Sequence, residues 1–268
     1  MKLLFIGDPH GNLEKINKIP IQKEKPDLIF LTGDLGKADL ARKIAFRDIE
    51  RDKNGLDRLE KSKEEIKNIH TEIHNSTLDV IKYLTGFASC YSIKGNLEIP
   101  GKKQINEYKE DFALKLSNTK EHLKKIKNFS LVQNQFRNFN GLKIGFLEYF
   151  IDNSWIKEFN EKIPEKVKDA KTETKKAKRV LERFGKYNVD IILCHQPPYG
   201  YLDKVNFSGV PKDWKGKHAG SKVILDYIKK YQPKYVFCGH IHEGEGYVKI
   251  GNTEVYNLGV AGHKFIEV

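Results

Sequence analysis

Short apolar runs recur along the 268-residue chain and predict buried β-strands. The runs are rich in Ile, Leu, Val, Phe and Tyr, and most of them end at a glycine or a polar residue. Because nearly every position within a run is apolar, we expect the strands to be buried on both faces. The expected strands are 2–7, 27–33, 88–93, 141–149, 190–195, 234–240 and 253–259.

Charged segments separate these strands and predict helices. The segment 38–86 is read as a first helix, a break at Asn54, and a long second helix with Leu56 and Leu59 on its apolar positions. Strands that alternate with helices indicate an α/β protein, here with a charged helical insertion at about 38–86, after the second strand. Further helices are expected at 11–22, 102–127, 155–187 and 222–231.

No internal repeat or low-complexity linker divides the chain, so we expect residues 1–268 to form a single domain. The apolar run at the N-terminus is too short for a signal peptide or a membrane span, which predicts a cytoplasmic protein without a membrane partner. Cys90, Cys194 and Cys238 lie in or beside apolar runs without CxxC spacing, and we expect buried, unpaired thiols. The oligomeric state stays open.

The net charge of +12 favours polyanionic partners such as nucleotides, nucleic acid or anionic surfaces. Most of the excess is lysine, which is scattered along helices of mixed charge. The segment 155–187 is the most basic of them, and it leaves a nucleic-acid contact as an alternative to a solvated helix face.

Polar side chains follow five of the expected strands at their carboxyl ends, where open α/β sheets form their ligand crevice. Their oxygen and nitrogen donors suit Mn, Fe, Zn and Co, and no thiolate is among them. There are too many for one ion, which favours two ions that share a bridging carboxylate. These side chains are Asp8, His10, Asp34, Asn96, His195, His240 and His242.

Taken in order, these blocks resemble the calcineurin-like metallophosphoesterase superfamily, and "CHQPPYGYLD", "HAGS" and "GHIHEGEG" are most similar to Icc-related predicted phosphoesterases. The resemblance implies a two-layered β-sandwich flanked by helices. It also implies a binuclear metal-dependent phosphoesterase, a hydrolase in which a metal-activated hydroxide attacks a phosphodiester or phosphomonoester. A small, nucleotide-like substrate is favoured.

The resemblance further implies a ligand set. One divalent ion would take Asp8, His10, Asp34 and His242, and the other would take Asp34, Asn96, His195 and His240, so that Asp34 bridges. Asp34, Asn96 and His195 would thereby be catalytic as well, and Glu98 would orient a ligand. Mn²⁺ is the favoured ion, with Fe, Zn, Ni or Co as alternatives.

One position departs from the family pattern. Members commonly have a histidine between the asparagine and the acid, where it protonates the leaving group, but this chain has Leu97. A substrate with a good leaving group, a substitute acid, or a slow enzyme that mainly binds would each accommodate the loss. The candidate for a substitute acid is His218, near the start of the helix 222–231, because a helix N-terminus favours a phosphate; the alternative is a loop histidine outside the site.

Two rival functions stay open at this stage. One is a nuclease that uses the basic helical segments, and the other is a metal-binding scaffold of low activity. His70 and His74 do not match a zinc-protease HExxH motif, so we expect both, and His122, at the surface.

Overall fold

The computed structural model describes residues 1–97, 102–159, 164–207, 210 and 212–268. Their first sheet has the order β11-β1-β2-β3-β4, in which neighbouring strands from β1 to β4 run parallel and β11 pairs antiparallel with β1. Its strands are β1 (Lys2–Ile6), β2 (Leu28–Leu31), β3 (Ser89–Ser92), β4 (Phe129–Leu131) and β11 (His263–Glu267).

The second sheet has the order β5-β6-β7-β8-β10-β9. Its inner strands β6, β7, β8 and β10 are parallel, and β5 and β9 complete the two edges as antiparallel strands. The strands are β5 (Gln135–Phe139), β6 (Leu142–Leu147), β7 (Ile191–Cys194), β8 (Tyr235–Cys238), β9 (Gly246–Ile250) and β10 (Thr253–Asn257).

Alternate side chains of the inner strands explain how the two sheets pack. Phe5 of β1 stacks on Phe237 of β8 with 3.8 Å between ring centroids, and this contact joins the two sheets face to face. Within the first sheet, Phe5 also stacks on Phe30 of β2 at 4.9 Å. Leu4 and Ile6 point the other way, into a second apolar cluster under the helices. This arrangement confirms the expected two-layered sandwich and explains why the strand sequences are apolar at nearly every position.

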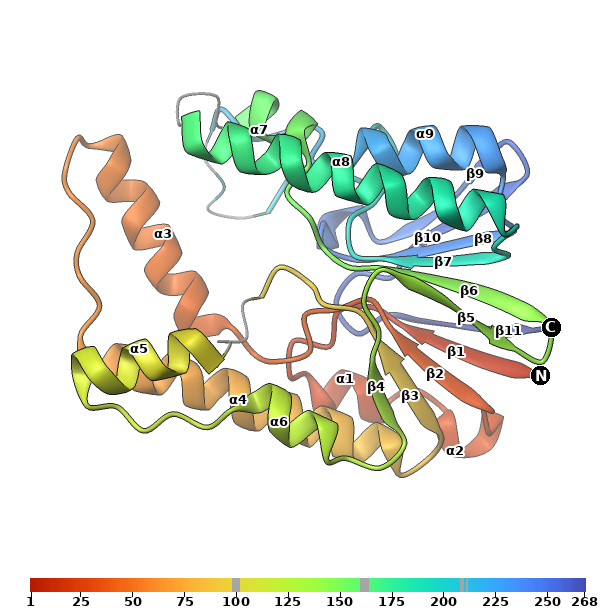
Figure 1. Cartoon of the computed structure of the whole chain (residues 1–268), viewed down its shortest axis with the longest axis horizontal. Helices are drawn as coiled ribbons and strands as arrows, with labels where there is room; N and C mark the ends of the chain where they lie inside the picture. The colour runs from red at the N-terminus through yellow and green to blue at the C-terminus, as the bar shows by residue number, and fades with distance from the viewer. Residues whose placement is uncertain (98–101, 160–163, 208–209, 211) are drawn as a thin grey trace.

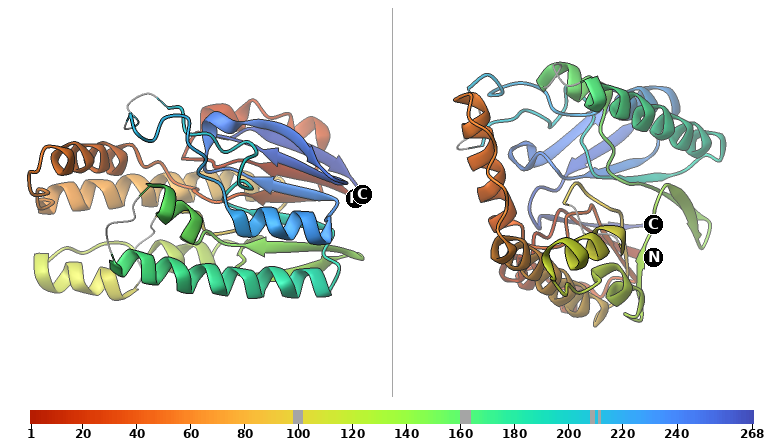
Figure 2. Two further views of the ribbon diagram at one scale, coloured as in Figure 1. Left: turned by 90° about the horizontal axis from the view of Figure 1, so that it is seen from above. Right: turned by 60° about the vertical axis from the view of Figure 1, so that its left-hand side comes forward.

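Helices cover the outer face of each sheet, as Figure 1 shows. The C-terminal half of α4 packs Val80, Ile81 and Leu84 against the first sheet, and α8 and α9 lie side by side over the second sheet (Figures 1 and 2). The helices are α1 (Leu13–Asn17), α2 (Ile21–Glu24), α3 (Asp39–Lys53), α4 (Lys63–Thr85), α5 (Lys102–Phe112), α6 (Thr119–Lys124), α7 (Asn153–Phe159), α8 (Pro164–Lys186) and α9 (Lys222–Tyr231).

The insertion differs from its prediction in one place. The second helix does not start after Asn54 but at Ser62, where the Ser62 side chain and Glu65 form a capping box. Leu56 and Leu59 therefore lie in a non-helical link, and they are 51% and 47% exposed. The helix α3 stands apart from the sheets at one side of the molecule (Figures 1 and 2), and its Phe46 stacks on Phe207 at 5.7 Å.

All the expected strands are present within their predicted ranges, but four short strands were missed. All four, β4, β5, β9 and β11, are edge strands of their sheets, and polar residues interrupt their apolar pattern. The three cysteines are buried and unpaired, as predicted. In the described part of the chain, no helix is long and apolar enough to cross a membrane.

Candidate metal centre

The loops that follow β1, β2 and β8 hold their polar residues in unusual backbone conformations. His10, Asp34 and His240 have φ angles of 43°, 40° and 66°, a left-handed region that non-glycine residues adopt only when the surroundings require it. A Cβ atom at Gly95 would collide with the Asp34 carboxylate, so glycine lets the loop after β3 lie directly against the loop after β2. The loops are therefore shaped to bring their side chains together.

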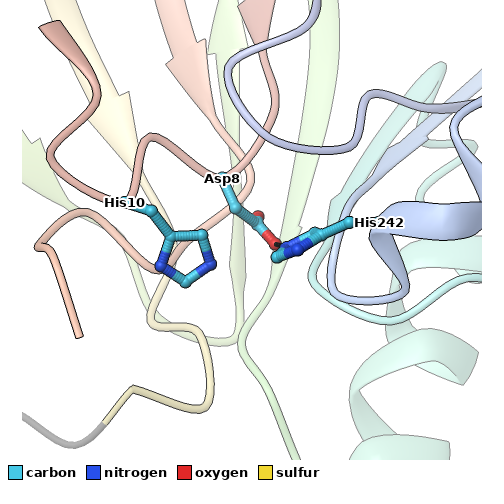
Figure 3. A group of neighbouring side chains, drawn as sticks. All are labelled: Asp8, His10 and His242. Atoms are coloured by element: carbon cyan, nitrogen blue, oxygen red, sulfur yellow. Dashed lines mark hydrogen bonds and ion pairs between the residues drawn. The ribbon is translucent and has the colours of Figure 1, made fainter. Parts of the chain in front are cut away.

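Asp8 is the most deeply buried carboxylate of the group and is held by three contacts. Its Oδ1 accepts a hydrogen bond of 2.5 Å from the Thr32 hydroxyl. Its Oδ2 accepts one of 2.6 Å from the His240 backbone N–H and lies 3.2 Å from His242 Nε2. Figure 3 shows the Asp8 carboxylate directed at the His242 ring, with the ring of His10 beside it.

Asp34 lies between a histidine that follows the first sheet, His10, and one that follows the second sheet, His195. Its Oδ2 lies 3.8 Å from His10 Nε2 and 3.6 Å from His195 Nε2. Its Oδ1 accepts a hydrogen bond of 2.8 Å from the backbone N–H of Leu97. Leu97 thus orients the central carboxylate through its main chain, which does not depend on the side chain at that position.

Asn96 meets two histidines of the second sheet. Its Oδ1 lies 2.7 Å from His195 Nε2 and 2.8 Å from His240 Nδ1. The other ring nitrogen of His195, Nδ1, lies 2.9 Å from the Thr32 carbonyl oxygen and must donate to it. In a neutral His195 ring, Nε2 then directs a lone pair at the Asn96 side-chain amide, so these two groups are placed to bind the same cation.

The donor set fits divalent metal ions. Both ring nitrogens of His10 are buried and have no hydrogen-bond partner, although buried polar atoms normally have one. Two trios offer ligand atoms within 4.8 Å of one another, namely Asp8 with His10 and His242, and Asp8 with Asp34 and His195. Carboxylate oxygen and imidazole nitrogen at such spacing are ligands for first-row divalent ions.

Burial and neighbouring charges together set the pKa values of the buried acids and histidines in this group. Burial would raise the pKa of Asp8, but His195 and His242 outweigh it and lower that pKa strongly. Burial opposes a charge on His195, yet the carboxylates of Asp8 and Asp34 raise its pKa. Burial and then His195 lower the pKa of His240 well below its ordinary value, which leaves that imidazole neutral.

Two residues of this centre were missed by the sequence analysis. Thr32 holds both the Asp8 carboxylate and the His195 ring, and only its place just before Gly33-Asp34 could have signalled it. Tyr149 follows β6, and its ring lies 5.7 Å from that of His195 and 5.6 Å from that of His240. Because burial raises the pKa of its phenol, Tyr149 stays protonated in this position.

His218 lies in a neighbouring loop. Its Nδ1 is 2.6 Å from Oδ1 of the buried Asp203, whose Oδ2 accepts the backbone N–H groups of Gly200 and Gly220. The start of α9 is already occupied, because Ser221 caps the Ile224 N–H and donates to Asp152 at 2.5 Å. The helix N-terminus therefore offers less to a phosphate than the sequence suggested. Glu98 lies outside the described residues.

Known proteins support the resemblance. A model of the calcineurin-like phosphoesterase family matches residues 1–244. Metallophosphoesterase domain-containing protein 1 of Homo sapiens is 38% identical over 73 residues, which are 27% of this chain and 20% of the human protein. A UPF0046 protein of Caenorhabditis elegans is 37% identical over 70 residues, 26% of this chain and 16% of its own. The matched segment thus spans a fifth or less of these relatives.

Solved structures share the fold along nearly the whole chain. A phosphopantetheinyl hydrolase from Mycobacterium tuberculosis is 14% identical, with a TM-score of 0.51 over 97% of this chain and 89% of its own. A dimetal phosphatase from Danio rerio is 9% identical, with a TM-score of 0.51 over 97% and 87%. Since the family model covers most of the chain, the protein belongs to the calcineurin-like phosphoesterase family.

Proposed function

We propose that this protein hydrolyses small phosphoesters, diesters or monoesters, at a centre of two divalent metal ions. The observation that carries the proposal is the convergence of the strand-end carboxylates, imidazoles and amide oxygen, with both buried ring nitrogens of His10 unpartnered. Such a cluster costs free energy when it is left without a cation, because burial penalises each unpaired polar atom.

The proposed ligand set is the one implied by the family. Asp8, His10, Asp34 and His242 would hold one ion, and Asp34, Asn96, His195 and His240 the other. Mn²⁺ is the proposed ion, with Fe, Zn, Ni and Co as competitors for the same nitrogen and oxygen donors. Two bound ions supply positive charge for the phosphoryl oxygens and lower the pKa of a water molecule.

The chain's own residues orient this donor set. Thr32 fixes the Asp8 carboxylate and, through its carbonyl, the His195 ring, while the Leu97 N–H fixes Asp34. Tyr149 covers the rings of His195 and His240 on one side and limits the access of water there. These contacts pre-position the ligands, which is the protein's main contribution to this chemistry.

We propose His218 as the residue that hands a proton to the leaving group. Asp203 at 2.6 Å from Nδ1 orients the ring and leaves Nε2 free to act. The next residue, Ala219, shares an apolar cluster with Ile241, which lies between His240 and His242. The His218 loop therefore packs against the loop of two proposed ligands, and this contact supports the role.

A nucleotide-like substrate is favoured over a nucleic acid. The helix α8 packs its apolar face on the outer face of the second sheet (Figure 1) and leaves its basic residues exposed there, whereas the candidate centre lies at the carboxyl ends of the strands. One solved structure that shares this fold is a phosphopantetheinyl hydrolase.

The test is hydrolysis of bis(p-nitrophenyl) phosphate by metal-stripped protein that has been refilled with Mn²⁺. We expect metal-dependent turnover that His240→Ala abolishes, while His263→Ala, which changes an exposed histidine, behaves like the natural protein. The p-nitrophenolate ion leaves without a proton, so Leu97 does not mask the activity. Absence of turnover with filled metal sites would instead favour a metal-binding scaffold, and steeply salt-dependent binding of DNA or RNA would favour a nuclease.

A further inference from the structure

Three histidines meet between α4 of the helical insertion and α6, apart from the metal centre. His70 and His74 are four positions apart on α4 and therefore share one face of that helix, and His122 comes from α6. The ring centroids of His70 and His74 are 5.9 Å apart, and those of His74 and His122 are 5.0 Å apart. The expectation that His70 and His74 are surface residues is wrong, because they are only 5% and 7% exposed, whereas His122 is exposed as predicted.

The spacing of two of the rings matches that of metal ligands. His74 Nε2 lies 3.3 Å from His122 Nδ1, which is longer than the usual hydrogen bond of about 2.7–3.2 Å. Two nitrogens bound to one tetrahedral zinc ion at about 2.0–2.1 Å are also separated by roughly 3.3 Å. The other nitrogen of His74 lies 2.8 Å from the Thr119 hydroxyl, the kind of outer contact that orients a ligating imidazole.

His70 supplies the second observation. Its Nε2 is buried and has no hydrogen-bond partner, although the ring stands beside that of His74. Burial also lowers the pKa of both His70 and His74, which keeps their nitrogens free of the extra proton at neutral pH. Neutral imidazoles are the form that binds a metal ion.

We propose that His70, His74 and His122 form a second metal site, for Zn²⁺ or a similar imidazole-binding divalent ion, with water as the remaining ligand. As the rings stand, no three of their ligand atoms lie within 4.8 Å of one another. Binding therefore draws the rings together, and the exposed His122 has room to turn. This site goes beyond the proposed phosphoesterase activity and does not depend on it.

An ion at this site would join α6 to α4, the helix that contacts a loop of the metal centre. The neighbouring face of α4 supports those loops, since Ser76 Oγ accepts the backbone N–H of Lys37 at 2.8 Å and Thr77 lies against Gly36. The ion would cross-link α4 to α6 within one helical turn of these contacts. Its role is structural: it would hold α4, which contacts the loop after Asp34, in a fixed position relative to α6.

The test counts zinc ions by elemental analysis after dialysis against a fixed micromolar concentration of free Zn²⁺. We expect His122→Gln to hold one zinc ion fewer than the natural protein. The matched control Lys125→Gln, which changes an exposed residue at the end of the same helix, should hold the full number. Because the readout is a difference, it does not depend on how many ions the phosphoesterase centre holds.

Two further results decide the assignment. Equal zinc content in the natural protein and His122→Gln would overturn the site and leave a simple contact between histidines. Zinc retained by His70→Gln would overturn the three-histidine ligand set. Turnover of bis(p-nitrophenyl) phosphate with Mn²⁺ and without zinc, which leaves the second site free of zinc in both proteins, should be the same in His122→Gln as in the natural protein. This control separates failure of the second site from failure of the proposed function.

Discussion

The molecule holds two groups of histidines that are built in different ways. In the candidate metal centre the histidines come from the loops that follow β1, β7 and β8, and the residues span positions 8 to 242. In the α4–α6 group, His70, His74 and His122 come from two helices with regular backbones. The first group depends on the order of strands in two sheets, and the second depends only on helical periodicity and one helix contact.

The two groups also differ in how firmly their side chains are held. In the centre, Asp8, Asp34 and His195 each make a hydrogen bond to a main-chain group, and three loop residues have positive φ angles. In the α4–α6 group, the Thr119 hydroxyl is the one hydrogen-bond partner outside the group that the described contacts show. Precise geometry at the centre is consistent with catalysis, whereas a looser group suits a structural ion.

The largest expected effect comes from Asp34→Asn. Loss of the carboxylate shared by both proposed ions should lower Mn²⁺-dependent kcat/KM by at least about 10³-fold, because several kcal/mol of charge stabilisation is removed. Zinc at the α4–α6 group should be unaffected. Asp226→Asn on the exposed side of α9 is the control. Loss of zinc from both groups in Asp34→Asn would show that they are not independent.

The next effect concerns a histidine added to the centre. In a His218→Gln background, which lacks the proposed acid, we expect Leu97→His to raise turnover of phosphodiesters with alkyl leaving groups by about 10²-fold, because a positioned acid contributes that much. The contact with Asp34 should survive, since it uses the Leu97 backbone. Turnover of p-nitrophenyl esters should change little. Leu97→Gln, which has a polar side chain without a transferable proton, should not give the increase.

A smaller effect is expected from Thr32→Val, which removes the hydroxyl that holds Asp8. Loss of such an outer contact typically weakens metal affinity about 10–100-fold, and a Mn²⁺ titration of the stripped protein would measure it. Thr253→Val is a matched control, because Thr253 is equally buried and its hydroxyl has no partner in the described contacts. Equal affinity in both variants would show that the firm geometry of the centre does not depend on Thr32.

The smallest effect is on the pH dependence of stability in metal-free protein. Burial lowers the pKa of His74 below 6.5 in the folded protein. As the pH falls through 6.5, the unfolded chain therefore binds a proton at His74 more readily than the folded chain does. Stability should therefore fall toward acid pH, and less steeply in His74→Gln. Urea midpoints at pH 7.5 and 5.5 measure the difference, with the exposed Asn75→Gln as control. Parallel curves would contradict the buried, neutral state of His74.

The sequence predicted the strands and the residues of the centre for the same physical reason. Parallel strands buried on both faces are strongly apolar, so a residue such as Asp34 or His195 at their ends stands out, and the sheet topology brings these ends together. The edge strand β5 was missed because its polar residues hide the pattern. Thr32 was missed because it lies inside an expected strand and looks like an ordinary strand residue.

The helices of the insertion were predicted less well. Helical periodicity placed α3 and α4 but could not say which faces meet, because the partner helix α6 lies about fifty residues further along the chain. His74 therefore looked like a surface residue until its contacts with Thr119 and His122 were known. The ligand assignment for the centre and the role of His218 stay predictions until metal content and activity are measured.

One feature of the centre reaches beyond catalysis. Asp8, His10, Asp34 and Asn96 follow strands of the first sheet, whereas His195, His240 and His242 follow strands of the second. Ions held by both sets would be thermodynamically linked to the packing of the sandwich, and each would add RT ln(1 + [M]/Kd) to the free energy of unfolding. A chelator would then act as a denaturant, and the lifetime of the folded protein would follow the supply of metal.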